Sequence, residues 1–287
     1  MSVTTTELVD NLHKNVLEIE KIYKTMKQIQ LREKDDIHNV FELQKLLEDV
    51  KTQSLLLLLK PELKKLVEDW ILEYTFKINN DIQLLKRRFG DELNSLLQIK
   101  GISLSGTYPD LVAEMFTIEV NFQIGFANIW YGPKQELLGR CKTVAPQVAG
   151  ALDKIRNSII SRPFDEKVFI NRLYQAYLRA LHKGGALDDQ AEIISVLDEL
   201  VFLQQDNRFL ANPAKENFKE YTRAFFSYDL FRLKDRRFEN KLLTISTAAR
   251  LQTKNRSGFL WLPTNTAGVG SYYGFISFRE DKHGLNA

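Results

Sequence analysis

Apolar residues along the first hundred positions recur every three or four residues, which is the spacing of one face of an α-helix. Asp35 and Asp36 interrupt the pattern and mark a break or a new helix cap. The pattern therefore predicts two successive helices. The first stripe consists of Leu8, Leu12, Val16, Ile19, Tyr23, Met26 and Ile29, and the second of Ile37, Val40, Leu43, Leu47 and Val50.

A third and longer stripe begins after Pro61, a residue that fits the first turn of a helix, and continues to Leu96. At about 1.5 Å per residue, a helix over 61–97 is on the order of 55 Å long. Helices this long do not wrap a core alone, so they pair within the chain or with a partner. The stripe residues that we predict to contact a partner protein are Leu63, Leu66, Trp70, Tyr74 and Ile78.

The spacing changes to strict alternation beyond Gly101. Phe116, Ile118, Val120 and Phe122 alternate with polar residues, as in a half-buried strand. A turn at 123–125 and a second alternating run from Phe126 indicate an antiparallel hairpin or small meander. Three more strands are predicted near the C-terminus, over 242–246, 258–262 and 272–278.

Residues 133–238 return to the helical pattern between these two groups of strands. Pro133, Pro146 and Pro163 each precede an apolar periodic segment, as is typical of helix starts. Helices are predicted over 165–182, over 191–205 and from Asn212 to Leu230. The chain is therefore predicted to be α+β and mainly α. A helical hairpin or coiled-coil arm over 1–99 precedes a globular head over 100–287 with a small antiparallel or mixed sheet.

Composition is that of an ordinary folded chain: of 287 residues, 44% are hydrophobic and 27% are charged. The longest apolar run, over 55–59, is far shorter than the roughly 20 residues that span a bilayer. The N-terminus lacks the pattern of a secretory leader. The single cysteine, Cys141, is interpreted as an apolar helix residue in a reducing compartment. We expect a soluble, cytoplasmic protein that does not contact a membrane.

Sequence motifs for cofactors or metals are absent, so no cofactor and no metal site is predicted. The four histidines, His13, His38, His182 and His283, lie far apart and not at metal-ligand spacing. The glycine-rich loop at 268–270 precedes a strand, so it lacks the helix N-terminus that binds phosphate. We interpret this loop as a hairpin turn.

Asp110 and Glu119 raise the alternative of a divergent metal-dependent nuclease, which needs clustered carboxylates and usually a lysine near them. The position two residues beyond Glu119 is Asn121 rather than lysine. Alternation also places Glu119 on the solvent face of an ordinary strand. No catalytic residue is therefore assigned, and the nuclease remains an alternative.

Basic residues cluster between Tyr221 and Arg256, where nine bases and three acids give 9 − 3 = +6, against +3 for the whole chain. Such a cluster binds a nucleic-acid backbone, pairs with an acidic partner or is simply solvated. The residues predicted to contact nucleic acid are Arg223, Arg232, Lys234, Arg236, Arg237, Lys241, Arg250, Lys254 and Arg256.

The helical hairpin, the stretch GTYPDLVAEMFTIEVNFQIGFANIWYG and the closing SGFLWLP and YYGFISF segments together resemble coiled-coil accessory subunits of prokaryotic multi-protein defence systems. The resemblance covers residues 100–132 and 241–280. In these systems such a subunit accompanies an SMC-type ATPase and a nuclease effector. The resemblance implies an assembly role and transfers no functional residue.

The leading hypothesis is a non-enzymatic accessory or scaffold subunit in anti-phage or anti-plasmid defence. Its arm would dock a protein partner, such as an SMC-type ATPase, or a second copy. Its head would dock an enzyme or DNA. The alternatives are a stand-alone nucleic-acid-binding protein and the divergent nuclease. The sequence leaves open whether the N-terminal helices pair within or between chains.

Overall fold

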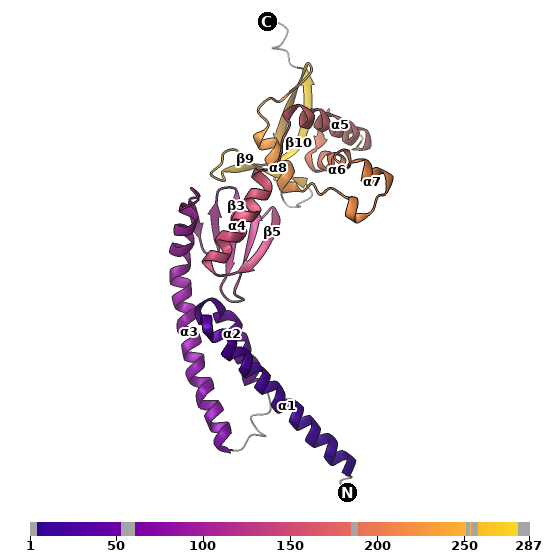
Figure 1. Cartoon of the computed structure of the whole chain (residues 1–287). Coiled ribbons are helices and arrows are strands. Elements are labelled where there is room, and N and C mark those ends of the chain that lie inside the picture. Colours follow the sequence, from indigo (N-terminus) through magenta and orange to yellow (C-terminus); the bar gives the residue numbers. More distant parts are fainter. Residues whose placement is uncertain (1–4, 53–60, 185–188, 251–252, 254–257, 281–287) are drawn as a thin grey trace. The chain divides into compact units, whose positions relative to one another are not determined.

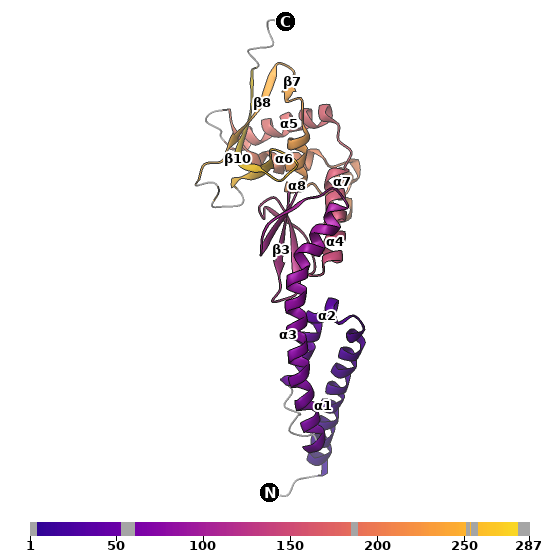
Figure 2. The same cartoon turned by 90° about the vertical axis from the view of Figure 1, so that its left-hand side faces the viewer.

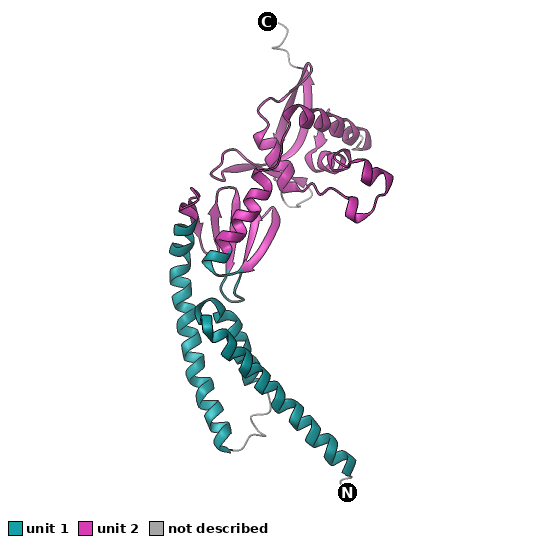
Figure 3. Ribbon diagram, viewed as in Figure 1, with its two compact units in different colours: residues 1–96, 121–126, 142–147 teal, residues 97–120, 127–141, 148–287 magenta. Residues whose placement is uncertain are grey.

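The computed structural model describes residues 5–52, 61–184, 189–250, 253 and 258–280. The chain divides into two compact units, which Figure 3 shows in different colours. Unit 1 consists of residues 1–96 with two later segments, 121–126 and 142–147. Unit 2 consists of residues 97–120, 127–141 and 148–287. The predicted fold class is confirmed, because long N-terminal helices precede antiparallel sheets in a mainly helical chain.

Helices form most of unit 1 (Figure 1). A short turn, Glu33–Asp35, joins α1 (Thr5–Arg32) to α2 (Asp36–Lys51), and α2 runs back along α1. The long helix α3 spans Pro61–Gln98. The helices therefore pair within the chain. Their shared core consists of Ile29, Val40, Leu43, Leu47, Val50, Ile71, Tyr74, Ile78, Ile82 and Leu85.

The two later segments of unit 1 complete this core. The ring of Phe122 meets the ring of Phe89 edge-on, with 5.7 Å between centroids. Gly125 has a φ of +69°, and a Cβ atom there would lie 2.5 Å from the Cβ atom of Phe41. Only glycine permits both this backbone conformation and this close approach.

The first sheet is a five-stranded meander in chain order. The alternating pattern predicted its middle strands correctly. The prediction of helix directly after Pro133 is wrong, because residues 136–142 form the fifth strand, and Cys141 lies on that strand. A seven-residue run is too short for periodicity to distinguish helix from strand. The strands are β1 (Leu104–Thr107), β2 (Asp110–Ala113), β3 (Phe116–Asn121), β4 (Phe126–Tyr131) and β5 (Glu136–Lys142).

Five α-helices follow the first sheet among the residues that the structure describes. The helix predicted from Asn212 begins only at Arg223, because Thr222 caps it by accepting a hydrogen bond from the Phe225 N–H at 3.4 Å. The helices predicted over 165–182 and 191–205 are present with shifted ends. The five are α4 (Ala145–Ile160), α5 (Glu166–Gly184), α6 (Ile193–Leu203), α7 (Asn207–Ala211) and α8 (Arg223–Arg232).

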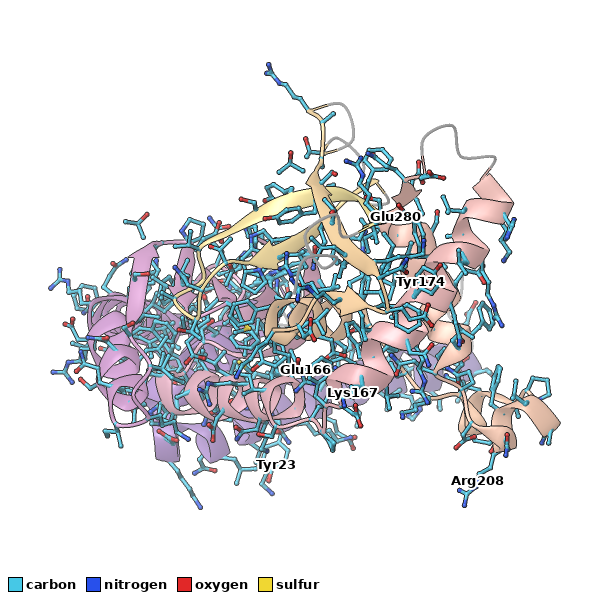
Figure 4. All side chains as sticks on the ribbon, turned by 90° about the horizontal axis from the view of Figure 1, so that it is seen from above. Tyr23, Glu166, Lys167, Tyr174, Arg208 and Glu280 are labelled. Atoms are coloured by element: carbon cyan, nitrogen blue, oxygen red, sulfur yellow. The ribbon has the colours of Figure 1, made fainter. Side chains whose placement is uncertain are left out.

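The second sheet is built around the long strand β10 (Gly270–Glu280), which pairs antiparallel with three others. Helices α5 and α6 pack near it (Figure 2). The ring of Tyr174 on α5, labelled in Figure 4, lies 4.7 Å from Phe238 and 5.0 Å from Phe278. The three predicted C-terminal strands are therefore present. The remaining strands are β6 (Ala191–Glu192), β7 (Arg237–Phe238), β8 (Lys241–Thr247) and β9 (Leu260–Pro263).

A bilayer-spanning segment is not found among the described helices, since none is both long enough and apolar enough.

Candidate functional site

The five residues predicted to contact a partner lie on the first half of α3, and the structure separates them. Tyr74 and Ile78 are only 6% and 2% exposed, because they pack in the core of unit 1. Partner contact through these two side chains is therefore a wrong prediction for this conformation. Trp70 is partly buried and stacks on Tyr74, with 4.7 Å between ring centroids. Leu63 and Leu66 are exposed.

Helix α1 carries a larger uncovered apolar surface, none of whose residues is among the five predicted to contact a partner. Its members are separated by three, four, three and four residues, which is the spacing of the a and d positions of a coiled-coil heptad. Each is between 46% and 58% exposed. We call these residues the α1 row: Val9, Leu12, Val16, Ile19 and Tyr23.

The α1 row is uncovered because α1 turns a neighbouring face toward the core. The buried residues of α1 are Ile22 and Ile29, seven residues apart. In addition, α1 has 28 residues and α2 has 16. At about 1.5 Å per residue these lengths are roughly 42 Å and 24 Å, so the first part of α1 extends beyond α2. Residues 5–21 contain no buried side chain.

Two of the nine predicted nucleic-acid-binding bases have structural roles in unit 2. The side chain of Arg232 is 16% exposed, and its Nε and Nη2 atoms donate to Oδ1 of Asp229 at 3.0 and 2.7 Å. Arg223 donates to the backbone oxygen of Phe259 at 2.9 Å. The prediction that Arg232 contacts nucleic acid is wrong, because its donors are already used inside the protein.

Asp229 is the centre of a buried charged cluster. Its carboxylate is 3% exposed and also accepts hydrogen bonds from Arg162 at 2.8 Å and from Tyr221 at 2.7 Å. Burial raises the pKa of the Tyr221 hydroxyl well above its ordinary value, and the neighbouring Asp229 charge adds to the effect. The two guanidinium groups stack on Phe225 and Phe164, at 4.1 and 4.0 Å from the ring centroids. The cluster ties α8 to the segment between α4 and α5.

The other bases form a smaller surface than the sequence suggests. Lys234, Arg236, Arg237 and Lys241 lie around the short strand β7, but Asp235 and Glu239 lie between them. Four bases and two acids leave a local charge of 4 − 2 = +2. Arg250 is exposed, and Lys254 and Arg256 fall outside the described residues. The nine bases are therefore not gathered into one described patch, and nucleic-acid binding stays a prediction.

Asp110 and Glu119 do come together, and a lysine joins them. The two residues are directly opposite each other on β2 and β3. The Nζ atom of Lys134, from the turn between β4 and β5, lies 2.9 Å from Oδ1 of Asp110 and 2.6 Å from Oε1 of Glu119. The sequence pattern of such a site expects the lysine two residues after Glu119. Lys134 was therefore not predicted, because it comes from a different turn.

Both oxygens of Glu119 are occupied. Oε2 accepts hydrogen bonds from the side chains of Asn128 and Trp130, each at 3.0 Å. The hydrogen bond from Asn128, followed by that from Lys134, lowers the pKa of Glu119 from 4.5 to about 2. No group of three or more His, Cys, Asp or Glu side chains within the described ranges is arranged to hold a metal ion. A divalent cation would therefore have to replace contacts that Lys134 now makes.

The Cys141 thiol on β5 is partly buried. Burial raises its pKa to about 11, so this thiol is not activated as a nucleophile.

A cleft of about 430 Å³ in unit 1 is lined in part by Arg32, Glu42 and Lys142. Glu42 lies 2.5 Å from Lys142 and 2.7 Å from Arg32, and these two cations lower its pKa. Two cations of this cleft are thus paired with the one carboxylate of Glu42.

Comparison of the chain with protein-family models, with curated proteins and with solved structures finds no match.

Proposed function

We propose that this chain is a non-enzymatic assembly subunit whose helix α1 docks an apolar helix of another chain. The α1 row carries the proposal: it has heptad spacing and stays about half exposed. A helix that packs against nothing is marginal in water, since most helical stability in proteins comes from burial of an apolar face. A role as an accessory subunit of a defence complex, with an SMC-type ATPase as partner, is compatible with this contact and is part of the proposal.

The proposal is tested by the size of the assembly that the tagged full chain forms in its source cells. We expect the wild-type chain to elute from gel filtration well above its own 33.3 kDa. The double variant Leu12→Glu/Val16→Glu should elute at a smaller size, because charges on the α1 row oppose docking. Leu210→Glu is the matched control, since Leu210 is 69% exposed on α7. Equal elution of all three proteins would contradict the proposal.

A second candidate function, metal-dependent cleavage of nucleic acid, is favoured by one observation. Lys134 supplies the cation that the sequence motif lacked, within 3 Å of both carboxylates. The occupied oxygens of Glu119 weigh against it. Incubation of the purified chain with single- and double-stranded DNA and Mg²⁺ or Mn²⁺ tests it. Cleavage that Glu119→Gln abolishes would support this function, whereas cleavage that survives the substitution would exclude this site.

A further inference from the structure

We infer that the helix docked on α1 is α1 of a second copy of this chain, running antiparallel. The inference rests on the proposed function, because it names the partner of the same surface. Two features of α1 lead to it: the residues that would meet in each layer, and the distribution of charge along the helix.

The first feature is the register. A two-fold axis between residues 17 and 18 places Val16 opposite Ile19 of the second copy. The same axis places Leu12 opposite Tyr23, and Val9 opposite Met26. Leu12, Val16, Ile19 and Tyr23 then each meet an exposed apolar residue, with a positions facing d positions. Met26, opposite Val9, is partly buried against the core of unit 1. His13 and Glu20, which flank the row, also come close to each other across the two copies.

The second feature is the distribution of charge along α1. Its first half, residues 5–18, carries three acids and one lysine, or 1 − 3 = −2. Its second half, residues 19–32, carries one acid and four bases, or 4 − 1 = +3. An antiparallel pair places the acidic half of each copy beside the basic half of the other, whereas a parallel pair places like charges side by side. The charge distribution therefore favours the antiparallel orientation.

Self-association is tested by light scattering on the purified full chain. We expect a mass of twice 33.3 kDa at tens of micromolar concentration, and dissociation on dilution. Val16→Glu should give the monomer mass, because the substitution places two carboxylates near the axis. Leu210→Glu should stay dimeric. A wild-type chain that remains monomeric at 100 µM would overturn the inference.

Orientation is tested by disulfide formation in a Cys141→Ser background, which removes the one native thiol. Leu12→Cys and Tyr23→Cys proteins carrying different tags are mixed and oxidised. An antiparallel pair cross-links the two different proteins and leaves each protein alone uncross-linked. A parallel pair cross-links each protein with itself, and this result would overturn the inference.

The two proposals fail in different ways. If the purified chain is monomeric but Leu12→Glu/Val16→Glu still reduces the assembly in source cells, self-pairing is wrong and docking of another protein stands. If the purified chain dimerises and cross-links as expected, both stand. If the row substitutions change neither the purified chain nor the cellular assembly, both are wrong.

Discussion

Asp229 is a buried carboxylate of unit 2 that contacts two arginines and a tyrosine. Its carboxylate neutralises one of two stacked arginines and accepts the hydrogen bond of a buried tyrosine. Asp229→Asn leaves both guanidinium groups without a counter-charge, so we expect the free energy of unfolding to fall by about 3–5 kcal/mol.

Urea denaturation followed by tryptophan fluorescence measures this loss. Asp235→Asn is the control, because Asp235 is exposed and its Oδ1 accepts only a backbone N–H, that of Arg237, at 3.0 Å. We expect the control to change stability by less than about 0.5 kcal/mol. Equal losses in the two variants would show that the Asp229 cluster does not stabilise the unit.

Glu119 makes the free energy of unfolding depend on pH. Folding lowers its pKa from 4.5 to about 2. Its ionised form therefore stabilises the folded chain above pH 4.5, and this contribution is lost as the pH falls toward 2. Glu119→Gln should reduce the difference in urea midpoint between pH 5 and pH 3. A carboxyl pKa near 4.5 for Glu119 in an NMR titration would contradict the expectation.

The sequence did not reveal the Asp229 cluster, and of the Glu119 cluster it revealed the carboxylates of Asp110 and Glu119 but not Lys134. Lys134 is 15 residues from Glu119, and Arg162 is 67 residues from Asp229. Spacing along the chain reveals only groups that one helix face or one strand brings together. Groups that meet through strand pairing or helix packing need the tertiary fold.

At the scale of elements, the long periodic helices and most of the short alternating strands were predicted, whereas β5 and the start of α8 were not. The apolar residues of α1, α2 and α3 keep the helical spacing over several turns, and a pattern of that length rarely arises by chance. The seven residues of β5 and the late start of α8 were missed, because pairing with a neighbouring strand and capping by Thr222 decide them. The heptad row on α1 was present in the sequence, but only the structure showed which face of the helix is covered.

The turn between β3 and β4 gives a prediction at this scale. Gly125→Ala introduces a Cβ atom 2.5 Å from Phe41 at a positive φ, so we expect it to destabilise the chain by more than about 1 kcal/mol. Gly150→Ala is the matched control. Gly150 lies inside α4 with no atom within 4 Å of the new Cβ, so alanine should stabilise the chain by about 0.5–1 kcal/mol. Thermal unfolding distinguishes these opposite signs.

At the scale of the whole molecule, unit 1 is assembled from three separated stretches of the chain. The sequence predicted a single domain boundary, between residues 99 and 100. A change in hydrophobic pattern reveals a boundary of this kind, but it does not reveal that a later strand hairpin supplies part of the helical core. Phe122 and Gly125 belong to unit 1 for this reason, although they follow β3.

A fragment of residues 1–99 should therefore be helical without melting cooperatively. It retains α1, α2 and α3 but lacks Phe122 and the segment 142–147, which leaves Phe89 without its ring contact. Circular dichroism at 222 nm should show a broad thermal transition for the fragment. A transition as sharp as that of the full chain would show that the helices complete their own core.

The divided composition of unit 1 also has a consequence for biosynthesis. On the ribosome, α1, α2 and α3 are translated before residues 121–126 and 142–147. Residue 147 follows residue 96 by 51 positions, which take about 3–10 s to translate at usual elongation rates. During that interval the nascent arm exposes both its unfinished core and the α1 row. Cotranslational chaperones are expected to bind the nascent chain in this window, before the hairpin arrives to close the core.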